Sequence, residues 1–268
     1  MTSDLPRYRS LRFTRTKHVG RLVLARANRL NAMSSSMLGE LRDLGGRLLA
    51  DRDSALRCLV VSGDGRSFST GLDLTEFSGG VIAELATRPS PDSMIGDGLD
   101  LAGSFEWLPR LPYPSIAAVR GHAYGGGFQL ALACDLRVFA RDALVGLTES
   151  RFGLVPDMGA TFRLPRIVAP GVARELILLG EIIDGERAYQ IGLANRVVDA
   201  DELDGAVQEL AEKVVGQSPT AVAAARRLLR GEGEEEARLL AAVREQAHCL
   251  RSEHFREALR ALADVEPR

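Results

Sequence analysis

The chain has 268 residues, of which 46% are hydrophobic, and a formal net charge of −2 at pH 7. This length suffices for one sizeable hydrophobic core, and the nearly balanced charge argues against a dedicated nucleic-acid surface. Three widely separated cysteines, Cys58, Cys134 and Cys249, argue against a disulfide framework or a zinc site. Because neither a secretory apolar region nor an apolar run of about 18 residues is present, we expect a cytoplasmic protein that does not span a membrane.

Two strand-and-loop units open the chain. Residues 21–25 form an apolar run that predicts a strand, and the loop 26–32 leads into a helix capped by a serine within 34–36. Residues 56–62 predict a second, buried strand, and the glycine-rich loop 63–74 follows it. Each loop therefore comes directly after the end of a predicted strand.

The segment 76–107 differs in composition from the chain around it. It lacks apolar periodicity and contains several glycines and prolines, which is typical of a mobile segment beside a binding site. We therefore predict a lid here. Its aspartates are expected to be solvated loop charges rather than ligands: Asp92, Asp97 and Asp100.

The stretch 115–135 carries the strongest local pattern. The apolar run 116–119 predicts a buried strand. Four glycines then fall within seven residues: Gly121, Gly125, Gly126 and Gly127. Glycines permit positive φ and close approach, and an apolar helix from Phe128 would begin with unpaired N–H groups. The spacing matches neither a P-loop nor a dinucleotide fingerprint, which leaves a neutral cluster of donors that could polarise a carbonyl oxygen.

The segment after this helix contains two carboxylates. Residues 144–147 form another short apolar segment, and Glu149 follows it. Pro156, Asp157 and Gly159 then predict a rigid turn before the next helix. The carboxylates are eight residues apart in the chain.

Beyond Val198 the composition changes to a region rich in alanine, leucine, glutamate and arginine. The apolar spacing and the glycine and proline breaks predict three helices, at 201–216, 219–230 and 234–264. These helices could form an interface between subunits, or they could form a helical cap that folds on the core of their own chain.

Taken in order, these motifs resemble the signature of the crotonase superfamily, the enoyl-CoA hydratase/isomerase family. The resemblance is carried by ARANRLNAM (25–33), FSTGLDL (68–74), PSIAAVRGHAYGGGFQLALACDLRVFA (114–140), ESRFGLVPDMGATFRLPRIV (149–168) and GEIIDGERAYQIGLANRVV (180–198). It implies an α/β fold in which ββα turns stack into a right-handed spiral over residues 1–198. Residues 199–268 would then be a C-terminal helical oligomerisation region.

The resemblance also implies where an acyl-CoA substrate binds. The backbone N–H groups of Leu72 and Gly126 would form an oxyanion hole for an enolate. The implied CoA-binding residues are Arg26, Asn28, Arg29, Leu30, Ser69, Gly71, Leu72, Asp73 and Leu74. For the side chains of Arg26, Asn28 and Arg29, the alternative is that they are solvated loop residues.

One position departs from the family pattern. Hydratases of the family carry two glutamates, and in this sequence the first falls on Gln129 and the second on Glu149. An amide can orient a water or a carbonyl, but it cannot exchange protons at neutral pH. Asp157 matches the aspartate that some family isomerases use as a second acid/base, with a turn-capping role as the alternative.

Together, the resemblance and this departure predict an enzyme that shifts a double bond in an enoyl-CoA, with Glu149 as the proton shuttle. Hydration of a 2-enoyl-CoA is one alternative, and a non-catalytic acyl-CoA-binding protein is another. The missing dinucleotide fingerprint disfavours an oxidoreductase. The family resemblance implies a homotrimer or hexamer, with no metal or redox cofactor, because coenzyme A is part of the substrate.

Overall fold

The computed structural model describes residues 6–51, 55–231 and 233–263. Its strands are β1 (Leu11–Thr16), β2 (Val19–Leu24), β3 (Cys58–Gly63), β4 (Ser115–Val119), β5 (His122–Tyr124), β6 (Leu136–Ala140), β7 (Leu144–Gly146), β8 (Ile182–Asp184) and β9 (Arg196–Val198). Within these residues, one sheet has six strands in the order β1-β2-β3-β4-β6-β9, and a second has the order β5-β7-β8.

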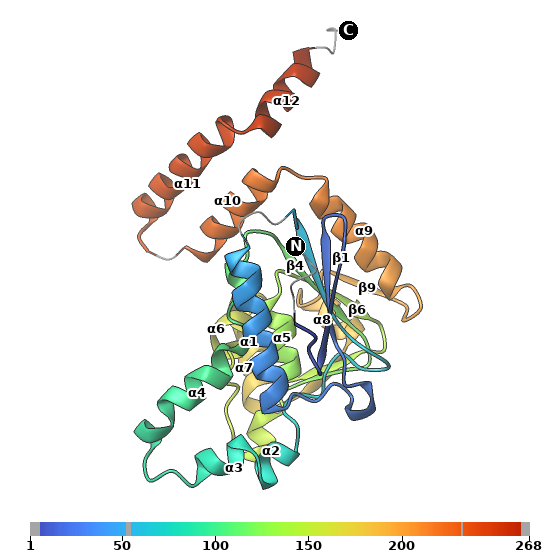
Figure 1. Ribbon diagram of the computed structural model, residues 1–268, viewed down its shortest axis with the longest axis vertical. Coiled ribbons are helices and arrows are strands. Elements are labelled where there is room, and N and C mark those ends of the chain that lie inside the picture. The colour runs from blue at the N-terminus through green and yellow to red at the C-terminus, as the bar shows by residue number, and fades with distance from the viewer. Residues whose placement is uncertain (1–5, 52–54, 232, 264–268) are drawn as a thin grey trace.

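Twelve α-helices accompany the strands in this described part of the chain. They are α1 (Ser35–Ala50), α2 (Thr75–Ser78), α3 (Val81–Ala86), α4 (Ile95–Ala102), α5 (Gly126–Ala133), α6 (Ala160–Arg163), α7 (Pro170–Leu179), α8 (Gly185–Gln190), α9 (Leu203–Val215), α10 (Pro219–Arg230), α11 (Glu235–Leu250) and α12 (Glu253–Ala263). Figure 1 shows α2 and α3 at one end of the molecule and α11 and α12 at the other.

The larger sheet is parallel from β2 to β9, and only β1 runs antiparallel, to β2. Every residue of β4 is buried, as expected for a parallel strand covered on both faces. Because β2, β3 and β4 are parallel, the loops that follow them meet at one end of the sheet. The glycine-rich loops predicted from the sequence therefore lie at the same end.

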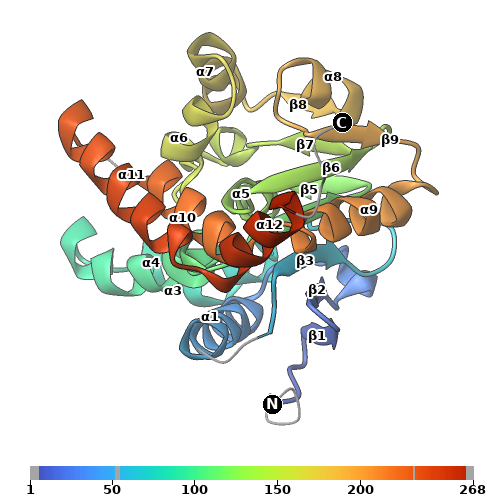
Figure 2. The ribbon, with the colours of Figure 1, turned by 90° about the horizontal axis from the view of Figure 1, so that it is seen from above.

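Two apolar layers enclose this sheet. Leu59 and Val61 of β3 face the main core, whereas Cys58 and Val60 face a second cluster formed with α9. In Figure 2, α9 runs along the strands on its own side of the sheet. Thus α9 lies within the predicted C-terminal region, yet it packs on the sheet through Leu203, Val207 and Ala211.

The predicted strands at 21–25, 56–62, 116–119 and 144–147 are confirmed as β2, β3, β4 and β7. The cap of α1 is Ser34, whose Oγ accepts from the Met37 N–H at 3.3 Å. In contrast, β1 was not predicted. Its inward-facing residues alternate with exposed ones in a charged edge strand, which gives a weak apolar signal.

One helical prediction needs correction, and one segment contains helices that were not predicted. The segment 234–264 is not one helix, because it breaks at Arg251 and the Ser252 Oγ accepts from the Phe255 N–H to begin α12. The lid segment is largely helical, since α2, α3 and α4 occupy it. Side chains of the segment also cap its own helices: Glu76 Oε2, for example, accepts from the Val81 N–H at the start of α3.

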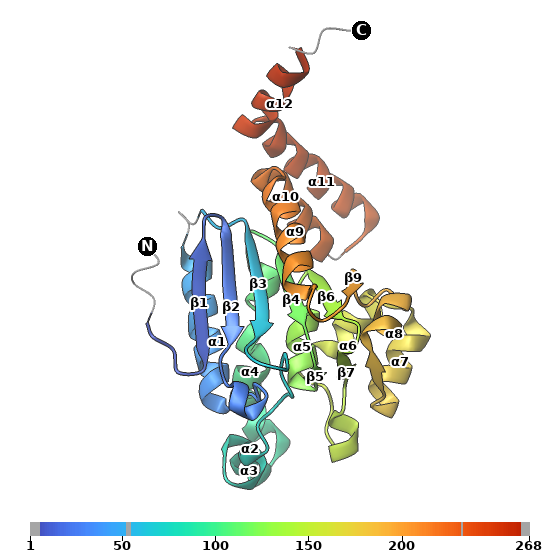
Figure 3. The same cartoon turned by 90° about the vertical axis from the view of Figure 1, so that its right-hand side faces the viewer.

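Helices α11 and α12 form an arm, residues 235–263, that projects away from the sheets (Figure 3). No residue of α11 is buried in the chain. Among the described residues, no helix is both long enough and apolar enough to cross a bilayer.

Candidate functional site

Two glycine backbones meet where the loop after β3 reaches the start of α5. Gly71 has φ +85° and Gly125 has φ +50°. A Cβ added to Gly71 would lie 2.7 Å from the Tyr124 carbonyl oxygen and 3.3 Å from the Gly126 nitrogen. Only glycine at position 71 therefore lets the two loops approach this closely.

Each of these loops presents an N–H group that no other described group accepts. Around Leu72, the Met33 N–H donates to the Gly71 carbonyl (2.7 Å) and the Asp73 N–H donates to the Met33 carbonyl (2.9 Å). Neither bond uses the N–H of Leu72, which lies between Gly71 and Asp73. The Gly125 N–H donates to the Gly146 carbonyl (2.9 Å), and the N–H of Gly126 begins α5 without a partner in the described chain. The two predicted oxyanion donors are thus neighbours.

Glu149 lies directly beside this pair. It begins the 3-10 helix η6 (Glu149–Phe152), which follows β7. A Cβ placed on Gly125 would lie 3.3 Å from Glu149 Oε1, so the carboxyl contacts the glycine turn. Glu149 Oε2 is buried and has no hydrogen-bonding partner among the described residues.

Gln129 fixes the other oxygen of this carboxyl. Its side-chain Nε2 donates to Glu149 Oε1 at 2.8 Å, and its Oε1 accepts from the Ala160 N–H at 3.2 Å. Because Ala160 supplies a donor, the Gln129 oxygen must face it, and the amide nitrogen must face Glu149. The side chain is 1% exposed, so the orientation is set by these two bonds rather than by water.

The two carboxyls of the site have perturbed acidity. Burial raises the pKa of Glu149, the Gln129 hydrogen bond opposes this, and the nearby Asp157 carboxyl adds to the increase. Asp157 has solvent-exposed surface, yet protein around its carboxyl also raises its pKa by desolvation. The arrangement brings together a buried acid, a second acid and two free N–H donors.

Several predicted CoA-binding side chains bond within the protein. Arg26 Nη2 lies 2.8 Å from Asp73 Oδ2, and its Nη1 donates to the Ala32 carbonyl. Ser69 is buried, and its Oγ donates to the Asn31 carbonyl at 2.8 Å. The structure therefore gives Arg26, Ser69 and Asp73 roles in shaping the loops. Asn28, Arg29 and Leu74 are exposed, and Leu30 is partly exposed.

Asn31 is a scaffold residue that the sequence analysis did not single out. It has φ +55° and is fully buried. Its Nδ2 donates to the carbonyls of Asp64 (2.9 Å) and Ser67 (2.8 Å), and its Oδ1 accepts from the Arg26 N–H (2.9 Å). Asparagine tolerates positive φ, and this was the available signal in the sequence.

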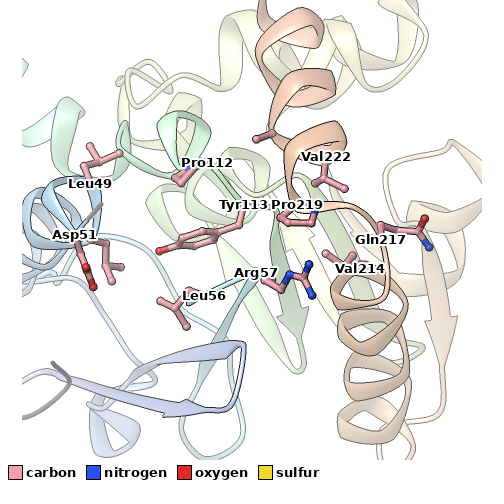
Figure 4. A pocket seen from close by; sticks show the side chains of 12 residues that line it. Leu49, Asp51, Leu56, Arg57, Pro112, Tyr113, Val214, Gln217, Pro219 and Val222 are labelled. Carbon is pink, nitrogen blue, oxygen red and sulfur yellow. The ribbon is translucent and has the colours of Figure 1, made fainter. Parts of the chain in front are cut away.

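A cavity of about 390 Å³ lies elsewhere, at the opposite end of the strands (Figure 4). Leu56 and Arg57 line it just before β3, and Pro112 and Tyr113 just before β4. The glycine loops and Glu149 come after the ends of strands instead, and none of the site residues lines this cavity. Within the described chain, no group of three histidine, cysteine, aspartate or glutamate residues is placed to hold a metal ion.

Comparison with known proteins matches this chain to a family. The model of the family described as enoyl-CoA hydratase/isomerase matches residues 14–264. A carnitinyl-CoA dehydratase from Citrobacter koseri is 37% identical over 229 residues, which cover 84% of this chain and 82% of the relative. The chain thus matches most of this relative's length.

Solved structures are similar over almost the whole chain. An enoyl-CoA hydratase from Bacillus anthracis superposes with a TM-score of 0.86 at 29% identity, covering 96% of each chain. A proposed enoyl-CoA hydratase from Thermobifida fusca YX, determined in complex with CoA, gives a TM-score of 0.80 at 36% identity, covering 90% of this chain and 93% of that one.

Proposed function

Because the chain belongs to the enoyl-CoA hydratase/isomerase family and has its crotonase fold, we propose that it shifts a double bond in an enoyl-CoA thioester. The observation that carries this proposal is the Gln129 amide, which is fixed against Glu149 at the position where a hydratase of the family has the first of its two glutamates. This leaves Glu149 as the acid/base group on that side, with Asp157 as the second carboxyl.

In the proposed reaction, the thioester carbonyl accepts hydrogen bonds from the N–H groups of Leu72 and Gly126. Glu149 removes a proton from C2 of a 3-enoyl-CoA, and the electron pair moves onto the thioester oxygen as a dienolate. A proton is then delivered to C4, and the double bond forms between C2 and C3. Loss of one such donor in other enzymes costs about 10² to 10³ in rate, so the two donors are central to the proposal.

Two carboxyls in different surroundings suit this proton movement. Glu149 is held by Gln129 and is largely desolvated, whereas Asp157 has access to solvent. One can therefore be protonated while the other is ionised, as a transfer between two carbons requires. In this scheme, Glu149 removes the proton from C2, and Asp157 can supply the proton that is delivered to C4.

Hydration or dehydration is the second candidate, and the name of the Citrobacter koseri relative favours it. Adding water to a 2-enoyl-CoA needs both activation of the water and delivery of a proton. Gln129 can orient a water but cannot exchange protons, and its Nε2 is already bonded to Glu149. For this reason we place isomerisation first.

One experiment separates the two candidates. The protein is incubated with 2-enoyl-, 3-enoyl- and dienoyl-CoA substrates, and the products are separated by retention time and mass. We expect products of unchanged mass and shifted retention. A mass gain of one water as the main product would replace the isomerase proposal with hydration, and dialysis against a chelator should leave either activity intact.

The Gln129→Glu variant tests the role of the amide. Glutamate has nearly the same size and would restore the paired carboxylates, so hydration of a 2-enoyl-CoA should rise about tenfold, or about 1.4 kcal/mol of transition-state stabilisation. The rate should depend on pH as a coupled pair of carboxyls does. The Ala160 N–H can still donate to a glutamate oxygen, so the fold should tolerate the change. If the wild type already hydrates the substrate well and the variant adds nothing, the inference from Gln129 is wrong.

We also propose that the protein assembles as a trimer or hexamer through its arm. Large apolar side chains on and beside the arm are exposed: Leu229, Leu239, Leu240, Val243, Leu250 and Leu259. The arm extends from α10, which is fixed to the core because Arg226 forms an ion pair with Asp135 at 2.8 Å. An apolar surface held on a rigid base is suited to bury itself against other copies.

Two truncations test the assembly. A chain ending at Gly231 lacks only the arm, and it should stay folded but become monomeric in light scattering. A chain ending at Val198 also loses α9, which would uncover Val60, Ile116 and Val138, so it should aggregate. A full-length protein that is monomeric at micromolar concentration would refute the interface.

A further inference from the structure

Arg163, the last residue of α6, joins two segments that are far apart in the sequence. Its Nη2 lies 2.6 Å from Glu106 Oε1, and its Nη1 donates to the Met158 carbonyl at 3.0 Å. The guanidinium also lies 4.8 Å from the centre of the Phe162 ring. Only 11% of the Arg163 side chain is exposed, so these contacts are shielded from competition by water.

On one side, Glu106 marks a fixed point at the end of the lid segment. The next residue, Trp107, packs so closely on α1 that a Cβ added to Gly45 would lie 2.1 Å from its ring. Trp107 Nε1 also donates to the Ser104 carbonyl at 3.1 Å. By contrast, α4 within the lid has no buried residue. The base of the lid is therefore anchored, while the helix before it is loosely packed.

On the other side, Met158 directly follows Asp157. Its side chain is 4% exposed, and its sulfur would lie 3.4 Å from a Cβ on Gly126. The next residue, Gly159, has φ +100°. Two hydrogen bonds from side chains hold this turn: the Met158 carbonyl accepts from the Arg163 guanidinium, and the Ala160 N–H donates to the Gln129 amide oxygen. Of these, the Arg163 bond is the nearer to Asp157.

We propose that Arg163 is a positioning residue that holds the Asp157 turn against the anchored base of the lid. Through this link, the carboxyl of Asp157 keeps a fixed place relative to Gly126 and Glu149. Arg163 acts through Asp157 and touches neither the free N–H donors nor Glu149. The proposal rests on the proposed function, in which Asp157 is the second acid/base.

The test uses Arg163→Gln and Arg163→Lys in the full-length protein, assayed with the substrate that the wild type isomerises best. Misplacing a catalytic group by about 1 Å can cost up to about 10² in rate, so Arg163→Gln should lower kcat about tenfold to 100-fold while KM changes little. Arg163→Lys should recover part of this loss, because its ammonium can reach one of the two partners but cannot span both.

A double-mutant cycle with Asp157→Asn decides how Arg163 acts. If Arg163 acts through Asp157, Arg163→Gln should cause no further loss of kcat in an Asp157→Asn background. Losses that multiply would overturn the proposal and leave the proposed function standing. Full isomerase activity in Asp157→Asn alone would remove Asp157 from the mechanism, and the Arg163 proposal with it.

Arg42→Gln is a matched control. Arg42 pairs with Asp100 at 2.9 Å and so also ties the lid to α1, but it does not contact the Asp157 turn. Arg42→Gln should retain wild-type kcat. An equal loss of kcat in this variant would mean that loosening the lid segment at any point slows the reaction, which would contradict a specific role for Arg163. Should Arg163→Gln fail to fold, Glu106→Gln removes the ion pair and leaves the Met158 bond. Glu106→Gln should then lower kcat by a smaller factor than Arg163→Gln, and it should cause no further loss of kcat in the Asp157→Asn background.

Discussion

Replacing Glu149 with glutamine is expected to lower turnover of an enoyl-CoA by about 10² or more, equivalent to about 2.7 kcal/mol of transition-state stabilisation. The amide would occupy the same space and still accept from Gln129 Nε2, so the site should keep its shape. The N–H groups of Leu72 and Gly126 are unchanged, and CoA should therefore bind nearly as in the wild type. Steady-state kinetics and calorimetry with CoA measure the two effects separately.

The control for this variant is Glu175→Gln, which changes an exposed glutamate on α7. It should behave as the wild type. Undiminished turnover in Glu149→Gln would remove Glu149 from the mechanism, and a parallel loss of CoA binding would show that the variant is damaged more widely.

The dependence of kcat/KM on pH is a second test of Glu149 as the catalytic base. Burial raises its pKa, with Asp157 adding to the increase, so the carboxyl stays protonated at pH values where an exposed glutamate is ionised. A base must be ionised to act. The acidic limb of kcat/KM should therefore lie above the ordinary glutamate range of about 4.3. A limb at or below that value would contradict the assignment of Glu149 as the base.

The second large effect is expected for Gly71→Ala. The new methyl would lie 2.7 Å from the Tyr124 carbonyl oxygen, at a φ of +85° that alanine rarely adopts. The loop must move away from Gly126, which separates the two N–H donors. We expect kcat to fall by about 10² to 10³, as when one oxyanion donor is lost. Strain and crowding should also lower stability by about 1–3 kcal/mol, measured by denaturant unfolding.

Gly153→Ala provides the matched control for Gly71→Ala. Gly153 has a similar φ of +71°, but a Cβ there meets no atom within 4 Å. It carries the backbone strain without the collision, so it should lose some stability and keep most of its turnover. Equal losses of turnover in both variants would show that strain alone explains the effect, and the pairing of the two loops would no longer be supported.

The sequence alone predicted the strands and glycine loops of the site because their signals are local. A buried parallel strand such as β4 is continuously apolar, and positive φ favours glycine at positions such as Gly71 and Gly125. The loop positions and the strands β3 and β4 were therefore readable, whereas β5, the short strand directly before Gly125, was not predicted. The resemblance to a known family supplied the positions of Gln129 and Glu149, which lie twenty residues apart.

The orientation of these side chains was not readable from the sequence. The Gln129 amide is oriented by the Ala160 N–H, 31 residues away, and Arg163 meets Glu106 across 57 residues. Such pairs depend on how the whole chain folds. The lid helices were missed partly for the same reason: Glu76 of α2 accepts from the Ser35 N–H at the start of α1, 41 residues away, and this contact lies outside any local window.

The burial of Glu149 Oε2, which has no hydrogen-bonding partner in the part of the chain that the structure describes, also has a thermodynamic consequence. A carboxyl whose pKa is raised by folding binds more protons when folded than when unfolded, so its contribution to stability declines as pH rises from the unfolded pKa through the folded one. At pH 8 the buried carboxylate of the wild type is ionised and lowers the free energy of unfolding, whereas the amide of Glu149→Gln carries no charge. We therefore expect the variant to melt at a higher temperature than the wild type. A screen that selected only for heat resistance would therefore enrich substitutions at position 149 and discard the proposed base.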